Sequence, residues 1–290
     1  MKSKFTLSLS LFLLLSLKAF ALVDYTETTS DQRSMQKTNY SSQKISAPDS
    51  RTLSWKSEFS FNANYESAQI ESNKYGFINL NTHFQTPFNM YLDLSYWNAS
   101  SKEGSQNGNP KVLVGLNWFK FGSPSDEAKI DFIAGAKFSG KSQLASTRTD
   151  KIFGIETTKR FGSFGLGLGY DITLTGSAKD ETEMDIGNIH RIVVSGGWMV
   201  SNDIQFEMEA ENFRIAEGST DKTITLSKEV TFSTLSPKLN LSLAPAINLE
   251  LGARFRMNKP SSAQDLKLAK LYDVHGAYTN SLFAGLGISL

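Results

Sequence analysis

Three histidines, His83, His190 and His275, are the side chains of this 290-residue sequence best suited to acid–base catalysis or metal binding. None stands in a metal-ligand spacing such as His-Glu-x-x-His, and the absence of cysteine excludes thiolate metal sites and disulfides. The glycine-rich stretch 164–170 is not followed by the Lys-Ser or Lys-Thr of a phosphate-binding loop. We therefore expect no metal site, no cofactor and no catalytic residue.

Charged residues offer a different chemistry, because many of them recur at every second position between apolar residues. The clearest instance is the acidic ladder Glu207, Glu209 and Glu211, whose side chains would project from one face of a strand at intervals of about 6.5–7 Å. Such a row attracts cations where it faces water, as acidic rings do in cation pores. The residues that share this polar phase, and that we expect to face the lumen of a barrel, are Glu58, Asp93, Asp131, Lys137, Glu156, Arg160, Asp171, Arg191, Glu207, Glu209, Glu211, Lys238, Glu250, Arg254 and Arg256.

Neutralisation by neighbouring bases is the alternative interpretation of the ladder. In an antiparallel arrangement, Arg191 comes within about one pairing step of Glu211, and Lys238 on the following strand is a second candidate. Arg254 and Arg256 lie on a further strand and could reach only across a narrow lumen. The other two acids of the ladder stand opposite an uncharged glycine and an uncharged serine. We therefore expect a mild preference for cations.

The elements that would position these side chains are β-strands, because apolar and polar residues alternate with a period of two from residue 51 to the end. The clearest segment, 164–174, sets large apolar residues against glycines, Asp171 and Thr173. Two weaker segments, 75–85 and 152–161, complete a set of about twelve strands, and ten to fourteen would fit the same pattern. We predict an all-β fold, a closed antiparallel transmembrane barrel.

The expected connections alternate between short and long. This sorting is typical of outer-membrane barrels, which have short periplasmic turns and long extracellular loops. A water-soluble antiparallel sheet with one buried face is the alternative, but it has no cause to sort its loops by length. The short turns are expected at 86–89, 162–163, 201–203 and 244–246, and the long loops at 98–110, 140–150, 175–188, from 216 onward and at 258–278.

The turns also predict the register of the strands. A two-residue turn pairs Phe161 with Phe164, and a three-residue turn pairs Leu243 with Ile247. Aromatic residues gather near the short-turn ends, as in the interfacial girdle of a membrane protein. These are Trp55, Phe88, Trp118, Phe164 and Trp198.

Residues 1–21 predict a secretory signal peptide. Lys2 and Lys4 precede a mostly apolar stretch of 13 residues, 5–17, which is shorter than the roughly 20 residues of a spanning helix. Small residues then precede a cut after Ala21. Without this segment the net charge falls from +1 to −2, which gives no reason to expect nucleic acid as a partner. Residues 22–50 are polar and predict a flexible periplasmic segment, and residues 51–290 form the predicted barrel.

The last predicted strand resembles the C-terminal strand of Gram-negative outer-membrane β-barrel proteins. In that family a glycine and large apolar residues precede the end of the chain, and Gly285, Ile288 and Leu290 occupy those positions here. The sequence departs from the family at Leu290, where Phe is usual, and at Phe283, where a polar residue is common. The resemblance implies a porin-like barrel in outer-membrane lipid, which the barrel-assembly machinery inserts through this strand.

A narrow porin or channel for passive diffusion of small polar solutes or ions is the function that we expect. Gly165, Gly167 and Gly169 are predicted to clear space on one wall of the lumen, which favours a pore. Outer-membrane phospholipases carry His and Ser alternating on one strand, and neither His83 nor His190 has a serine two positions on. The alternatives are a structural or surface-binding barrel with a filled lumen, an autotransporter translocator and an outer-membrane hydrolase.

Overall fold

The computed structural model describes residues 57–70, 73–102, 104–123, 126–219, 224–258, 260, 263–274 and 276–289. The predicted signal peptide, the predicted polar segment and Trp55 lie outside these residues. Among the described residues, no helix is long and apolar enough to cross a membrane.

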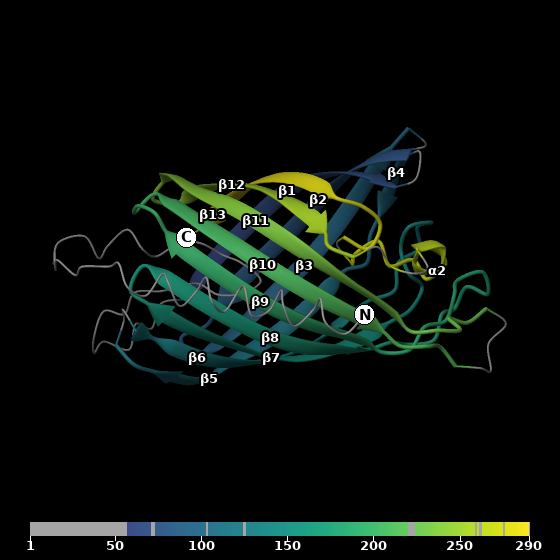
Figure 1. Cartoon of the computed structure of the whole chain (residues 1–290), viewed down its shortest axis with the longest axis horizontal. Coiled ribbons are helices and arrows are strands. Elements are labelled where there is room, and N and C mark those ends of the chain that lie inside the picture. Colours follow the sequence, from purple (N-terminus) through teal and green to yellow (C-terminus); the bar gives the residue numbers. More distant parts are fainter. Residues whose placement is uncertain are drawn as a thin grey trace, which may run out of the picture. The chain divides into compact units, whose positions relative to one another are not determined.

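Thirteen strands within the described residues form one antiparallel sheet that closes into a barrel (Figure 1). Closure comes from β1, which pairs with both β13 and β2, while β3 pairs with both β2 and β5. Because β4 pairs only with β3, it extends beyond the wall, and twelve strands make the barrel, as predicted. The elements are β1 (Glu58–Ile70), β2 (Asn73–Gln85), β3 (Met90–Ser101), β4 (Gly104–Asn107), β5 (Lys111–Phe121), β6 (Ala128–Lys137), β7 (Asp150–Phe161), β8 (Phe164–Leu174), β9 (Ile189–Met199), β10 (Ile204–Ile215), β11 (Val230–Ala244), β12 (Ile247–Arg256), the helix α2 (Ala263–Leu268) and β13 (Ser281–Ser289).

The outer face of the barrel is apolar along most of each strand. On β8, Leu166 is 42% exposed and Leu168 is 56% exposed, whereas Gly169 between the outward positions is buried. The same alternation recurs on the other strands, so large apolar side chains form a continuous band. An exposed apolar band of this extent is typical of a surface in contact with lipid.

The strand registers agree with the sequence prediction at the β7–β8 turn and differ from it at the β11–β12 turn. Phe161 pairs with Phe164, as predicted. The prediction that Leu243 pairs with Ile247 is wrong, because Ala244 takes that place and β11 shifts register between residues 242 and 244. The turn is therefore Pro245 and Ala246 alone. Proline has a fixed φ and no N–H group, and both properties suit it to a tight turn. Leu243, which the turn does not include, enters β11 as an irregularity.

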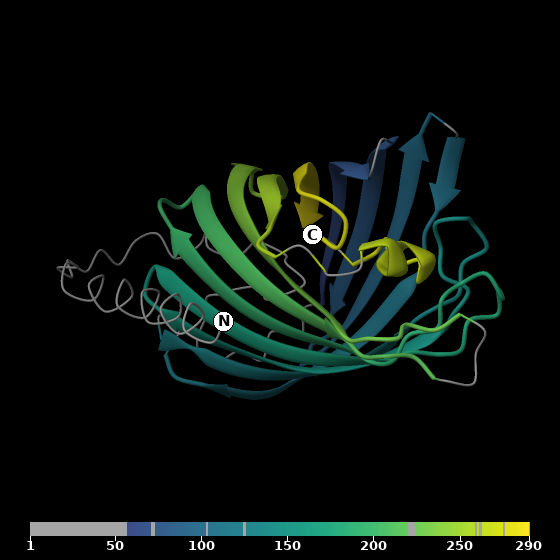
Figure 2. The same ribbon diagram turned by 45° about the vertical axis from the view of Figure 1, so that its right-hand side comes forward.

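Connections are sorted by length between the two ends of the barrel, with one exception. The turns β2–β3, β5–β6, β7–β8, β9–β10 and β11–β12 are short and lie at one end, and exposed Phe88, Trp118 and Trp198 lie near them. The connections β3–β5, β6–β7, β8–β9, β10–β11 and β12–β13 lie at the other end, the loop end (Figure 2). The exception is β1–β2, where Ile70 pairs with Asn73 across a two-residue connection at the loop end.

Two clusters of buried apolar side chains lie at the loop end. The first joins the ends of β9, β10 and β11 to the loops and to α2: Met184, Ile186, Ile189, Phe213, Ile215, Leu226, Val230, Phe232, Leu266, Ala269, Leu271 and Ala277. The second joins β1, β2 and β3 to the β6–β7 loop: Ile70, Phe77, Trp97, Ala99 and Leu144. The loops therefore form a packed cap with a core of its own.

Candidate functional site

The charged residues predicted to face the lumen all lie on the inward face, buried or half-buried, and alternate with the exposed apolar residues. Nine of them are acids and six are bases. Three of the bases lie at the ends of the barrel and bind turns or loops. Arg160 donates to the carbonyl of Gly162, Arg256 donates to the carbonyls of Ala277 and Tyr278, and Lys137 contacts the cap. Among these fifteen residues the acids therefore outnumber the bases, and Lys111, which pairs with Lys137 in strand register, adds a base to the same face.

Arg191 is the centre of one cluster of charges on the inner wall. Its Nε lies 2.6 Å from Oδ2 of Asp171, and its Nη1 lies 3.0 Å from Oε1 of Glu211. The hydroxyl of Thr234 donates to the other oxygen of Glu211 at 3.2 Å. The pairing of Arg191 with Glu211 is the one that the sequence predicted. It neutralises Glu211, the residue of the acidic ladder nearest the loop end.

Lys238 on β11 is the base that lies beside Glu207 and Glu209, the two other residues of the ladder. Its Nζ lies 3.3 Å from Oε2 of Glu209, and Glu207 pairs with Lys238 in strand register. Glu207 also accepts a hydrogen bond from Nε2 of Gln205 at 2.8 Å. One lysine thus faces a region that holds Glu207, Glu209 and, on β12, Glu250, so charge compensation here is partial.

Two further acids of the inner wall lie on β6 and β7. Asp131 and Glu156 stand directly opposite each other in strand register. Like charges in this position repel each other, and Lys129 on the same strand as Asp131 compensates part of this repulsion. Among the described residues, no group of three or more histidine or acidic side chains is arranged to hold a metal ion.

Glycines on the inner wall are covered by neighbouring side chains. A Cβ built on Gly167 would lie 2.3 Å from the hydroxyl of Ser195, and one on Gly169 would lie 3.3 Å from Cγ of Glu156. The ring of Tyr91 lies over Gly115 in the same way. At Gly167 and Gly169, side chains from the neighbouring strands therefore occupy space that the sequence analysis expected to be clear.

Comparison with known proteins gives no match by sequence, since no protein-family model and no curated protein matches the chain. Solved structures do match. The NanC porin aligns with 12% identity over 80% of this chain and 100% of its own, with a TM-score of 0.51. This chain folds as an outer-membrane β-barrel. Outer membrane phospholipase A from Escherichia coli aligns with 10% identity over 89% of this chain and 95% of its own, with a TM-score of 0.41. A loop L8 deletion mutant of OmpT from Vibrio cholerae aligns with 9% identity over 81% of this chain and 99% of its own, with a TM-score of 0.39.

The two described histidines of this barrel form pairs that the sequence analysis missed. Nδ1 of His83 lies 2.6 Å from Oδ1 of Asp93 on the inner wall, and Nδ1 of His190 lies 2.8 Å from the hydroxyl of Tyr170 on the outer face. The first pair follows from the short turn after β2, which sets residues 83 and 93 opposite each other. His275 is outside the described residues.

The cap over the loop end is held by a buried arginine. Arg148 has no exposed surface, and its Nη1 lies 3.0 Å from Oε1 of Glu183. Its guanidinium also donates to the carbonyls of Met184, at 3.2 Å, and Ala269, at 3.0 Å. These contacts join the β6–β7, β8–β9 and β12–β13 loops. Sequence reasoning placed Arg148 in a polar loop, and no local signal marks it as buried.

Proposed function

We propose that this protein is a narrow, cation-preferring channel for passive diffusion of small polar solutes or ions. The observation that carries the proposal is the surplus of acids on the inner wall, where Asp131 faces Glu156 and Glu207 shares Lys238 with Glu209. Acidic walls of this kind raise the local concentration of cations and lower their entry barrier. The proposal assigns no catalytic role to any residue.

The direction of the ion pairs favours a channel over a barrel with a filled lumen. Arg191 binds acids on the two strands beside β9, and Lys238 binds an acid on the strand beside β11. Arg254 on β12 reaches Glu66 on β1, with only β13 between them, at 2.9 Å. These pairs run along the wall. A lumen filled by side chains would instead be crossed by pairs between opposite strands.

Current through a planar bilayer tests the proposal. The purified protein is expected to give discrete current steps, and its reversal potential under a KCl gradient should indicate a mild cation preference. Replacing Glu207 and Glu209 with glutamine should shift the reversal potential toward equal permeability, because two carboxylates of the wall lose their charge. Glu229, which is on the outer face and 42% exposed, provides the matched control: Glu229→Gln should leave the reversal potential unchanged. An unchanged value for the double variant would contradict the role of the ladder.

We also propose that the chain resides in the outer membrane after cleavage of residues 1–21, with lipid and the barrel-assembly machinery as its partners. The apolar outer band and the fold support this location. N-terminal sequencing of the protein from outer-membrane fractions should begin at Leu22. Recovery from the soluble periplasm, or a sequence that begins at Met1, would contradict the proposal.

A further inference from the structure

Four asparagines form an uncharged patch on the inner wall at β1 and β2. In strand register Asn62 stands opposite Asn81, and Asn64 stands opposite Asn79. On β1 the two asparagines share the phase of Glu66, which faces the lumen, and directly paired residues lie on the same face of a sheet. Asn81 is exposed although it faces inward, so open space lies in front of this patch.

Most hydrogen-bonding groups of these four amides are not used within the barrel. The side chains of Asn79 and Asn81 form no hydrogen bond with the described residues. Oδ1 of Asn62 and Oδ1 of Asn64 also have no partner among these residues. Nδ2 of Asn62 donates to Oε2 of Glu250 at 3.4 Å, which is a long hydrogen bond. Because each amide can donate two and accept two hydrogen bonds, the patch has capacity for a bound molecule.

A hollow in the wall lies beside the patch, on β13. Gly287 stands opposite Asn62 on β1 and opposite Asn248 on β12. It is an exception among the glycines of the inner wall, since a Cβ built on it would have no atom nearer than 3.9 Å. Neighbouring strands are about 4.8 Å apart, so the two amides flank a floor about 9–10 Å wide. The amide trough, as we call this surface, consists of Asn62, Asn64, Asn79, Asn81, Asn248 and Gly287.

The wall that faces the amide trough carries charges that bind one another. In the closed order of strands, five strands separate β1 from β8 in either direction, so the two are opposite each other. Asp171 on β8 binds Arg191 on β9, and Arg191 also binds Glu211 on β10. These side chains are engaged in ion pairs, whereas the amides of the trough are not. A molecule that gains hydrogen bonds in this part of the lumen therefore gains them at the trough.

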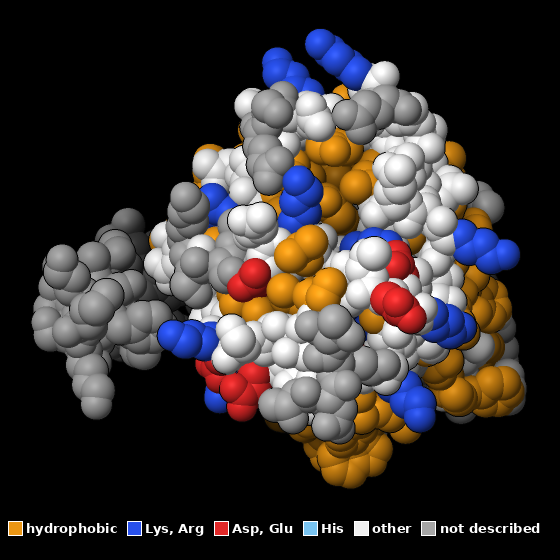
Figure 3. Space-filling view, turned by 90° about the vertical axis from the view of Figure 1, so that its right-hand side faces the viewer, with side chains coloured by type: hydrophobic (Ala, Val, Ile, Leu, Met, Phe, Trp, Pro, Cys, Tyr) orange, Lys and Arg blue, Asp and Glu red, His pale blue; other side chains and the backbone are white. Residues whose placement is uncertain are grey.

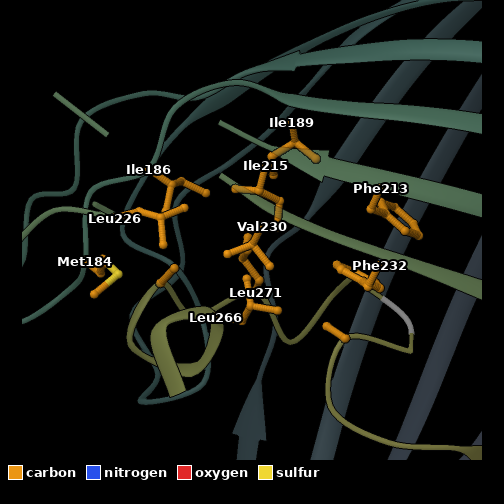
Figure 4. Packing of buried hydrophobic residues seen from close by; sticks show 12 residues of the cluster. Met184, Ile186, Ile189, Phe213, Ile215, Leu226, Val230, Phe232, Leu266 and Leu271 are labelled. Carbon is orange, nitrogen blue, oxygen red and sulfur yellow. The ribbon is translucent and has the colours of Figure 1, made fainter. Parts of the chain in front are cut away.

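The cap leaves space over the strands that carry the trough. At the loop end of β9 to β11, Leu266 and Leu271 pack with Val230 and Phe232 in the first apolar cluster (Figure 4). Over β1 to β3, in contrast, lies a half-enclosed cavity of about 30 Å³, and Asn79 is one of the residues that line it. This volume holds about two water molecules, or hydroxyl groups of the same size. Apolar and charged side chains of the cap cover the outside of this end (Figure 3).

We infer that the amide trough is a binding site for uncharged polyhydroxylated solutes, that is sugars or polyols, on their way through the channel. A hydroxyl group both donates and accepts hydrogen bonds, so it replaces water at an amide without needing a charged partner. The side chains of the trough offer an inorganic ion no countercharge. This inference rests on the proposed function and names the class of solute that the channel takes.

Block of the potassium current by glucose tests the site. Glucose added to both compartments of a planar bilayer should reduce the current saturably. Tetraethylene glycol is of similar mass but has hydroxyls only at its ends, and it should reduce the current only as far as it raises the viscosity. Replacing both Asn79 and Asn81 with leucine, which is similar in size, should weaken glucose binding roughly tenfold, because two hydrogen-bonding side chains are lost. Gly287→Val fills the floor, keeps every amide and should weaken glucose binding as well.

Asn212→Leu is the matched control, because it makes the same substitution on the outward face of β10 and should leave the block by glucose unchanged. The reversal potential should stay native in all these variants, since the amides carry no charge. Equal block of the native protein and the trough variants, or equal block by glucose and tetraethylene glycol, would overturn the inference, while the dependence of the reversal potential on Glu207 and Glu209 keeps the channel. Absence of current in the native protein would overturn both.

Discussion

Replacing Arg148 with methionine is expected to weaken the cap by about 3–5 kcal/mol, which is the usual cost of removing one partner from a buried ion pair. The substitution removes the donor that joins Glu183 to the carbonyls of Met184 and Ala269. The carboxylate of Glu183 keeps its hydrogen bonds from Ser146 and Thr147, whereas the two carbonyls lose the Arg148 donor. Buried acceptors that lose a hydrogen bond keep their desolvation cost without compensation. The twelve-stranded wall does not depend on this residue and should remain folded.

Hydrogen exchange separates these two effects. The amides of Met184 and Asp185 donate to carbonyls of the β12–β13 and β10–β11 loops, so they report on the cap. Their exchange should accelerate by roughly a hundredfold to several thousandfold, since each 1.4 kcal/mol changes an opening equilibrium tenfold. Amides in the middle of β8 should keep their protection. Lys141→Met removes an exposed cation from the same loop and should change neither set. Equal exchange in the two variants would show that Arg148 does not hold the cap together.

The sequence predicts the wall well because the wall has one physical requirement. Within the membrane the outer face contacts lipid and the inner face contacts polar groups, so a period of two identifies strands, phase and register together. The pairing of Arg191 with Glu211 follows from this pattern, as does the inward placement of Asp131 and Glu156.

At the loop end, apolar residues lie on the inward face and polar residues on the outward face. The prediction that apolar residues face outward therefore fails there. Ile70 and Phe232 lie on the inward face, where they pack into the cap, while Asn212 and Arg214 on β10 face outward. A pattern search that expects apolar residues outside ends the strands too early. For this reason Glu66 on β1, which binds Arg254, was not recognised as a lumen residue.

The cap was beyond prediction for a second reason. Arg148 binds groups 36 and 121 residues away, in loops without any periodic pattern. Leu226 and Leu266 are isolated apolar residues in polar segments, and only the assembled loops bring them together. The cap therefore depends on contacts between loops, and neither composition nor spacing identifies such contacts.

Replacing Leu168 with arginine should destabilise the barrel by about 2–4 kcal/mol, the cost of a cation on the lipid face near mid-depth. Leu168 lies in the middle of β8, is 56% exposed and pairs with Thr157 and Val194 on the adjacent strands. Its side chain has no acid to pair with on this apolar surface, whereas in water an arginine at an exposed position would cost little. The substitution thus measures whether this face contacts lipid.

Ser195→Arg is the matched control, because Ser195 follows Val194 on β9 and so lies at almost the same depth on the opposite face. There the guanidinium enters the lumen beside Glu209, its partner in strand register, and the acid surplus compensates it. Urea titration in lipid vesicles, followed by the gel mobility of the folded barrel, should show a lower midpoint for Leu168→Arg and a near-native one for Ser195→Arg. If both variants unfold at the native midpoint, the outer band is not in lipid. If Ser195→Arg is the less stable variant, the inner face is not the polar one, and the acidic wall cannot line a path for cations.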